Sequence, residues 1–413
     1  MNALDHTFIR HQFPAFQEPS LDNFAYFENA GGTYACGPVV ERLAEHYRRL
    51  KLQAYYPSRP SQEAGERMDS GRARLAAWLN VTPEELQLGP STSQNTYVLA
   101  QAFRQSLKPG DEIIVTDQDH EANIGAWQRL SAAGLTLKTW QVDPCSGELD
   151  PATLAPLLTE RTRVVAFTHC SNLVATVNPV RTIIEMAHAA GALAVVDGVG
   201  HAPHALPDLA ALGADIYLFS LYKVYGPHLG AMYVRRSLLE SLPNQGHFFN
   251  EGKPNTRLVP AGPDHAQVAA VNGVIDYLES VARHHGLDGQ PPPVMARGVS
   301  ELFQAQEARL MAPLLEFLRH RRGVRLLGRP HTEGRAPTLA FTCAGIAPWA
   351  LAQRLAAENI GIGAGNFYAW RLLEALGIDP NIGVARLSLV HYTSEQEVAR
   401  VISALDRLLP AAS

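Results

Sequence analysis

Residues 219–230 read Phe-Ser-Leu-Tyr-Lys-Val-Tyr-Gly-Pro-His-Leu-Gly, and they place one lysine, Lys223, between two apolar runs. One run, 215–219, precedes the lysine, and the other, 230–234, follows a turn-forming Gly-Pro pair. This pattern predicts a strand, a tight loop that holds Lys223, and a second strand. A lysine beside hydrophobic strands loses solvation, which favours its neutral amine and its use as a nucleophile towards aldehydes. Most lysines near turns point into water, however, so the loop alone does not identify a site.

A carboxylate upstream, that of Asp197, supports a functional role for Lys223. Asp197 ends another apolar run, Ala192 to Val196, upstream of the lysine. An acid and a lysine at the ends of two neighbouring strands suit pyridoxal phosphate (PLP), which needs an anion beside its pyridinium nitrogen and an amine for its imine. The two residues together therefore indicate a PLP site.

Strand and helix patterns alternate over the middle of the chain. The strand candidates are Leu86–Leu88, Glu112–Thr116, Leu135–Val142, Thr162–Thr168, Ala192–Asp197, Asp215–Phe219 and Ala231–Val234. Near-continuous apolar strands between helices are typical of a mostly parallel sheet that is covered on both faces. The last run starts too soon after the Lys223 loop for a helical crossover, so we expect it to be antiparallel.

The chain of 413 residues is long enough for one large domain and a smaller one. The segment Gly286 to Pro293, with three consecutive prolines, is predicted to be the linker, and a long helix is expected over Ser300–Arg321. The predicted organisation is an N-terminal arm (1–25) that packs with the small domain, a large PLP-binding α/β domain (26–285) and a small C-terminal α+β domain (294–413).

Composition excludes several other classes of protein. A net charge of −5 and the absence of a basic tract give no sign of nucleic acid or an anionic membrane as partner. No export signal and no membrane-spanning run are recognisable, and the four cysteines are scattered with no close pair to bind a metal. We therefore expect a reduced, cytoplasmic protein without a metal site.

Further polar residues follow the other predicted strands. Thr92 and Ser93 open a helix, where hydroxyls and amides bind phosphate but also serve as ordinary helix caps. His120 could stack on an aromatic cofactor or lie in solvent, and Asn172 could contact a phenolate or form a turn. Because the carboxyl ends of parallel strands share one edge, where open α/β sheets bind ligands, we expect these residues to converge.

The segments 195–198 (Val-Val-Asp-Gly) and 214–227 (Ala-Asp-Ile-Tyr-Leu-Phe-Ser-Leu-Tyr-Lys-Val-Tyr-Gly-Pro) resemble the PLP signature of the class V aminotransferase superfamily, most closely its cysteine desulfurase-like branch. The similarity extends from 26–31 to 385–393. It implies PLP-dependent transferase fold type I, with a mostly parallel seven-stranded sheet, and a homodimer with its active sites at the interface.

The resemblance also implies a role for each site residue. Lys223 would hold PLP as a Schiff base and move protons at the substrate α-carbon, Asp197 would pair with the pyridinium, and His120 would stack on the ring. Arg386 would clamp the substrate carboxylate with its guanidinium fork. The remaining assignments are Asn172 to the ring hydroxyl, Thr92, Ser93 and Ser220 to the phosphate, and Asn29, Asn366 and Tyr368 to the substrate.

The chain departs from the desulfurase pattern at three cofactor positions. Gly200 stands where a glutamine is usual, and Tyr222 stands where a histidine precedes the lysine. Lys253 replaces a threonine that reaches the partner subunit's phosphate. We expect the Tyr222 hydroxyl and the Lys253 ammonium to contact phosphate as well.

The departure that bears most on function is a missing cysteine. The mobile cysteine loop of desulfurases should fall at Gly361–Trp370, which contains no cysteine. Cys343 is predicted to lie in the core of the small domain, and Cys36 is the one cysteine expected near a ligand. The sequence therefore predicts a carbon–sulfur (β-elimination) lyase that lacks a persulfide cysteine. Its substrate is expected to be a small amino acid, which reacts after forming a Schiff base with PLP.

Two other readings stay open. An aminotransferase or amino-acid epimerase would need only reprotonation at another carbon or face. A non-catalytic PLP-fold binding protein is the third reading, and the presence of Lys223, Asp197 and Arg386 together argues against it.

Overall fold

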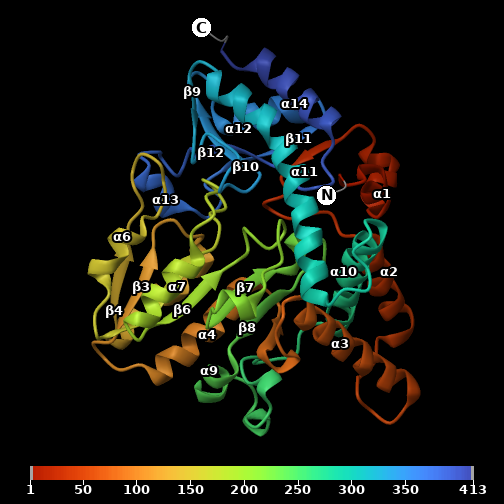
Figure 1. The fold of residues 1–413 in the computed structure, drawn as a ribbon, viewed down its shortest axis with the longest axis vertical. Coiled ribbons are helices and arrows are strands. Elements are labelled where there is room, and N and C mark those ends of the chain that lie inside the picture. The colour runs from red at the N-terminus through yellow and green to blue at the C-terminus, as the bar shows by residue number, and fades with distance from the viewer. Residues whose placement is uncertain (1–2, 411–413) are drawn as a thin grey trace.

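Two β-sheets organise the chain, of which the computed structural model describes residues 3–410 (Figure 1). The larger sheet has seven strands in the order β2-β8-β7-β6-β5-β3-β4. Its strands are β2 (Leu86–Gly89), β3 (Glu112–Thr116), β4 (Thr136–Trp140), β5 (Thr162–Thr168), β6 (Leu193–Asp197), β7 (Ile216–Ser220) and β8 (Gly230–Val234). Each coincides with a predicted strand to within a few residues, so the prediction of fold type I is confirmed.

Strand direction places the predicted site at one edge of this sheet. The pairs β3–β4, β3–β5, β5–β6 and β6–β7 are parallel, whereas β8 is antiparallel to β7, as its short connection predicts. Asp197 is the last residue of β6, and Ser220 is the last residue of β7 beside it. The polar residues that follow these strands therefore start from a common edge.

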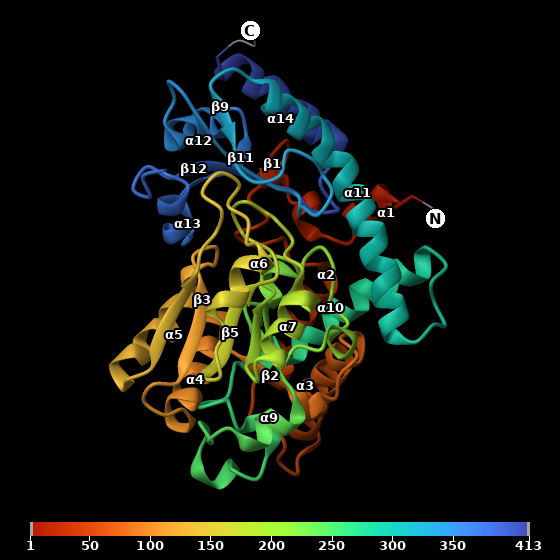
Figure 2. The same cartoon turned by 60° about the vertical axis from the view of Figure 1, so that its left-hand side comes forward.

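Helices cover both faces of the large sheet (Figure 2). On β6, Val195 packs in a hydrophobic cluster with α4 (Thr92–Ser106) and α5 (Glu121–Gln128). Its neighbour Val196 packs in a second cluster, with α7 (Val180–Ala189) and α10 (His265–His284). Successive side chains of a strand point to opposite faces, so burial on both sides requires the near-continuous apolar runs seen in the sequence.

The smaller sheet has five strands in the order β1-β11-β12-β10-β9. They are β1 (Ala25–Phe27), β9 (Val324–Leu326), β10 (Thr338–Cys343), β11 (Ile360–Gly365) and β12 (Val384–Ser388). β1 pairs in parallel with β11, and Ala25 and Phe27 are buried in the core of this sheet. The first strand therefore completes the small sheet, although the sequence reading counts residues from 26 onward with the large domain.

Two segments of the chain differ in secondary structure from the sequence prediction. α11 runs from Pro292 to His320, so the last two prolines of the expected linker form the first turn of the long helix. Proline is favoured there because its missing N–H would have no helical partner. In addition, 360–365 is a strand rather than part of a loop. Gly363 suits that strand because the ring of Phe367 fills the place of a side chain, 2.7 Å from where a Cβ would lie.

Nine further α-helices complete the described part of the chain. They are α1 (His6–His11), α2 (Gly37–Glu45), α3 (Arg59–Trp78), α6 (Pro151–Leu154), α8 (Leu209–Leu212), α9 (Arg236–Ser241), α12 (Pro348–Ala356), α13 (Trp370–Ala375) and α14 (Glu395–Leu408). Within residues 3–410, none of the helices combines the length and the apolar character that crossing a membrane requires. The arm reaches the C-terminal segment, where Arg10 pairs with Glu397 at 3.0 Å.

Candidate active site

A cavity lies at the carboxyl edge of the large sheet. The structure brings together in its lining all the predicted cofactor residues except Lys253: Thr92, Ser93, His120, Asn172, Asp197, Ser220, Tyr222 and Lys223. These residues come from segments spread over about 130 positions of the chain, and the parallel strand order explains why they meet.

Lys223 is the buried cation of this cavity. It closes a single helical turn, Leu221–Lys223, directly after β7, and the residue is only 7% exposed. Burial lowers the pKa of its amine to about 8, the Arg386 cation acts in the same direction, and Asp197 opposes both. The neutral amine is therefore far more accessible than in a solvated lysine, as a Schiff-base lysine requires.

Asp197 faces the same cavity from the neighbouring strand. Its Oδ1 accepts a hydrogen bond from the Val199 amide at 2.9 Å, and its other oxygen has no partner within residues 3–410. Burial raises the pKa of this carboxyl, although the Val199 N–H and Lys223 limit the rise. A ring cation placed against the free oxygen would stabilise the carboxylate, so this acceptor fits the N–H of a pyridinium.

Hydroxyl groups gather where α4 begins. Oγ1 of Thr92 and Oγ of Ser220 share a hydrogen bond of 2.7 Å, and both residues are buried. The N-cap of α4 is Ser91, whose Oγ accepts from the Gln94 amide at 3.2 Å. Tyr222 lines the same part of the cavity, and its ring stacks on His228. A helix N-terminus with converging hydroxyls is suited to a phosphate dianion.

His120 is the N-cap of α5. Its Nδ1 accepts from the Ala122 amide at 3.0 Å, which places the ring proton on Nε2. Burial lowers the pKa of this imidazole to about 4, and the Lys223 and Arg386 cations add to the effect. The ring is therefore neutral at physiological pH, and a flat neutral ring at the cavity wall suits stacking on an aromatic cofactor.

Arg386 of β12 reaches this edge from the small sheet. It is 5% exposed, and its Nη1 donates to the backbone carbonyl of Asn172 at 3.1 Å. Burial lowers the pKa of the guanidinium to about 10, while Glu28 nearby opposes the shift. A buried cation beside a lysine and a cofactor cavity is suited to an anionic substrate group.

Three other predicted site residues lie outside the lining of the cavity. Asn29 does not line the cavity: its Nδ2 donates to the Ser388 carbonyl at 2.9 Å, and its Oδ1 accepts from Tyr392, which ties β1 to β12. Lys253 is exposed in an irregular segment and contributes nothing to the cavity of its own chain. Tyr368 is 68% exposed and lies beside His120, with ring centroids 5.0 Å apart.

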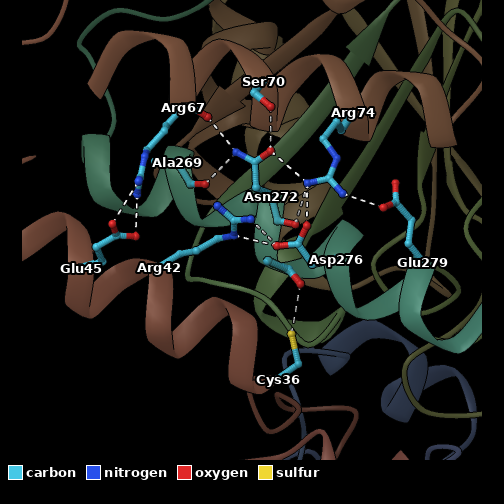
Figure 3. A network of polar contacts seen from close by, with 11 residues as sticks. Cys36, Arg42, Glu45, Arg67, Ser70, Arg74, Ala269, Asn272, Asp276 and Glu279 are labelled. Atoms are coloured by element: carbon cyan, nitrogen blue, oxygen red, sulfur yellow. Dashed lines mark hydrogen bonds and ion pairs between the residues drawn. The ribbon is translucent and has the colours of Figure 1, made fainter. Parts of the chain in front are cut away.

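The positions of the cysteines differ from those predicted from the sequence. Cys36 is fully buried below the contacts that join α2, α3 and α10, and its Sγ donates to the Gly273 carbonyl at 3.5 Å (Figure 3). The cavity is lined instead by Cys170, which the sequence reading did not single out. Burial raises the pKa of both thiols to about 12, so neither is a ready nucleophile. Cys343 ends β10 and is half-buried rather than fully in the core.

Gly200, where the desulfurase pattern has a glutamine, also lines the cavity. A Cβ on this residue would lie 2.4 Å from the carbonyl oxygen of Cys170. The backbone at 170 thus occupies the space that a side chain would need, which explains the departure. Within residues 3–410, no group of histidine, cysteine or acidic side chains could hold a metal ion.

Comparison with known proteins identifies the family of the chain. The family model described as Aminotransferase class-V matches residues 25–283 and 294–401. The chain is 34% identical to the aminotransferase-like protein FGM3 of Gibberella zeae, over 97% of this chain and 98% of that protein. It is 30% identical to a cysteine desulfurase of Dickeya dadantii, over 97% and 96%. The crystal structure of the cysteine desulfurase CsdA from Escherichia coli superposes with a TM-score of 0.82 at 26% identity, covering 99% of this chain and 100% of that one.

Sequence, fold and cavity converge on one assignment. Lys223 and Asp197 fit the imine and pyridinium partners of PLP, and the α4 hydroxyls fit its phosphate. The chain belongs to the class-V aminotransferase family and is a pyridoxal-phosphate-dependent enzyme of the cysteine desulfurase-like branch.

Proposed function

We propose that the protein is a carbon–sulfur lyase that acts on a small amino acid and releases the sulfur directly into solution. The reaction breaks the Cα–H and Cβ–S bonds of the substrate, and water converts the resulting enamine to pyruvate and ammonia. PLP, when bound, supplies an electron sink for the charge left at Cα.

The side chains of this chain would divide the remaining work. Lys223 removes the Cα proton, since a buried amine with a pKa of about 8 is a competent general base near neutral pH. Arg386 binds the substrate carboxylate and fixes which Cα bond faces Lys223. Asp197 keeps a cation at the ring nitrogen, and His120 covers one ring face.

The observation that carries the lyase proposal is the chemistry of the loop after β11. The resemblance places the sulfur-accepting cysteine within 361–370, which contains no cysteine, and residues 366–369 of this segment read Asn-Phe-Tyr-Ala. The cysteine that lines the cavity, Cys170, is 2% exposed, and its Sγ donates to the Ala175 carbonyl at 3.4 Å. Among the residues that line the cavity, Cys170 is the one cysteine and its thiol is buried, so elimination leaves the sulfur as free sulfide or thiol.

Product analysis tests this function. The holoenzyme is incubated with a panel of amino acids, including L-cysteine, while pyruvate, sulfide and other keto acids are followed. From L-cysteine a lyase gives pyruvate, ammonia and sulfide in equal amounts. Cys36→Ala is the matched variant, because its thiol is buried away from the cavity. Sulfide release should continue at the parent rate, and loss of sulfide in this variant alone would restore a persulfide mechanism.

An aminotransferase is the second candidate. It is favoured by the 34% identity to a protein described as aminotransferase-like, which exceeds the 30% identity to a cysteine desulfurase. The same panel separates the two, because transamination gives the keto acid of each substrate without sulfide and requires a second keto acid for repeated turnover. An epimerase would give neither product and would change only the optical rotation.

The buried amine predicts the pH dependence of cofactor uptake. Burial lowers the pKa of Lys223 from 10.5 to about 8, so the neutral, nucleophilic form is lost as pH falls below that value. The rate at which the apoprotein binds PLP covalently should rise through pH 8 and then level off. Arg386→Gln removes a neighbouring cation, so the midpoint should move to higher pH. Absorbance of the protein-bound cofactor after mixing measures both rates, and a midpoint near 10.5 in the parent would contradict the assignment.

We propose a homodimer as the working form. Phe248 and Phe249 are 85% and 66% exposed, and they adjoin Lys253, which the resemblance directs at the partner subunit's phosphate. Exposed aromatic side chains beside a cation suit a surface that another subunit covers. Native mass measurement should give twice the chain mass. Phe248→Asp with Phe249→Asp should shift the protein to monomer, and a monomeric parent would refute the proposal.

A further inference from the structure

The loop between β11 and α13 makes a direct contact with the residue that the proposed function assigns to the substrate carboxylate. The guanidinium carbon of Arg386 lies 3.7 Å from the centroid of the Phe367 ring. At that distance a cation is attracted to the negative face of an aromatic ring, and the attraction grows when both groups are desolvated. Arg386 is 5% exposed, so this contact is largely shielded from water.

Phe367 also contacts the large domain. Its backbone carbonyl accepts a hydrogen bond from Nδ2 of Asn172 at 2.9 Å. The carbonyl of Asn172 in turn accepts from Nη1 of Arg386 at 3.1 Å. Phe367, Asn172 and Arg386 thus form a closed triangle, in which the phenylalanine is held by both of its neighbours.

The backbone of the loop is adapted to this placement. Phe367 and Tyr368 have φ angles of +51° and +58°, a left-handed conformation that non-glycine residues adopt only when their surroundings hold them there. Gly363 of β11 provides the space for the ring, because a Cβ there would lie 2.7 Å from Cε1 of Phe367. Backbone conformation and packing therefore both hold the ring against the guanidinium of Arg386.

We propose that Phe367 is a positioning residue that fixes the guanidinium plane of Arg386 for the substrate carboxylate. This inference rests on the proposed function, which makes an amino acid the substrate. The ring covers one face of the guanidinium, and Asn172 holds Nη1. Nε and Nη2 have no hydrogen-bond partner within residues 3–410, and Nε is buried. This edge is the one left to bind a carboxylate in bidentate fashion.

Equilibrium binding of two small amines to the PLP-loaded enzyme tests the role. Glycine carries an amine and a carboxylate without a side chain, whereas methylamine lacks the carboxylate. Phe367→Leu should weaken glycine binding about tenfold, measured by the absorbance change of the bound cofactor, and should leave methylamine binding unchanged. In turnover with any amino acid that the panel identifies, KM should rise while kcat changes little.

A second variant removes the contact between Phe367 and Arg386 without replacing Phe367. Gly363→Ala should displace the ring and weaken glycine about as much, again with methylamine unaffected. The double variant should bind glycine no worse than either single variant, because both changes remove the same interaction. Parent-like glycine affinity in Phe367→Leu, or equal weakening of both amines, would overturn the proposal. Binding does not depend on turnover, so failure of the lyase function would show only as missing pyruvate and sulfide.

Discussion

Turnover should fall by at least about 10³-fold when Lys223 is replaced by arginine. The substitution keeps a positive charge in the buried position after β7 and changes its chemistry. A guanidinium stays protonated at any accessible pH, so it can neither form an imine with PLP nor accept the Cα proton. Two functions are lost at once, which is why this substitution should have the largest effect of those considered.

The measurement compares turnover and covalent cofactor content of Lys223→Arg with those of the parent. Lys138→Arg is the matched control, because Lys138 pairs with Glu112 at 2.7 Å on the outer strands of the sheet, away from the cavity. The control should keep both properties. A Lys223→Arg protein that turned over at the parent rate would require a different base and a different imine.

Asp197→Asn should lower turnover by about 10²–10³-fold while the protein keeps its cofactor. The asparagine Oδ1 can still accept from the Val199 amide, so the loop after β6 should hold its shape. The lost charge is the one that keeps a proton on the ring nitrogen, without which the ring withdraws fewer electrons from Cα. The expected signature is therefore normal PLP content with a large loss of turnover.

Cofactor absorbance, turnover and melting temperature together separate this outcome from unfolding. Asp150→Asn is a suitable control, since Asp150 is an exposed carboxylate that caps α6 and asparagine caps helices equally well. Parent-like turnover in Asp197→Asn would mean that the carboxylate does not act on the ring. Loss of PLP together with turnover would assign it to binding instead.

Much of the large domain could be predicted from sequence because its strands are short apolar runs buried on both faces. Asp197 and Ser220 could be placed at one edge for the same reason, since each ends a parallel strand. The strand β11 was missed because three of its six residues are glycine, which has low strand propensity. It is paired with β1 and β12, and no local sequence pattern reveals these pairings.

Contacts between distant segments account for the other differences. Cys36 follows a glycine pair and was expected near a ligand. In the structure it is buried against α10, where its Sγ donates to the Gly273 carbonyl. Cys170 lies two residues after β5, and its position in the cavity could have been inferred from that spacing. The Phe367–Arg386 contact depends on the tertiary arrangement of β11 and β12, so no sequence signal could have found it.

The attachment site of the cofactor tests the role of Lys223 most directly. The yellow holoenzyme is reduced with borohydride, which converts the imine to a stable secondary amine, and the digested protein is searched for the modified lysine by mass spectrometry. The label should lie on Lys223 and on no other lysine. A label on a different lysine, or a protein that binds no PLP while Lys223 is intact, would contradict this role.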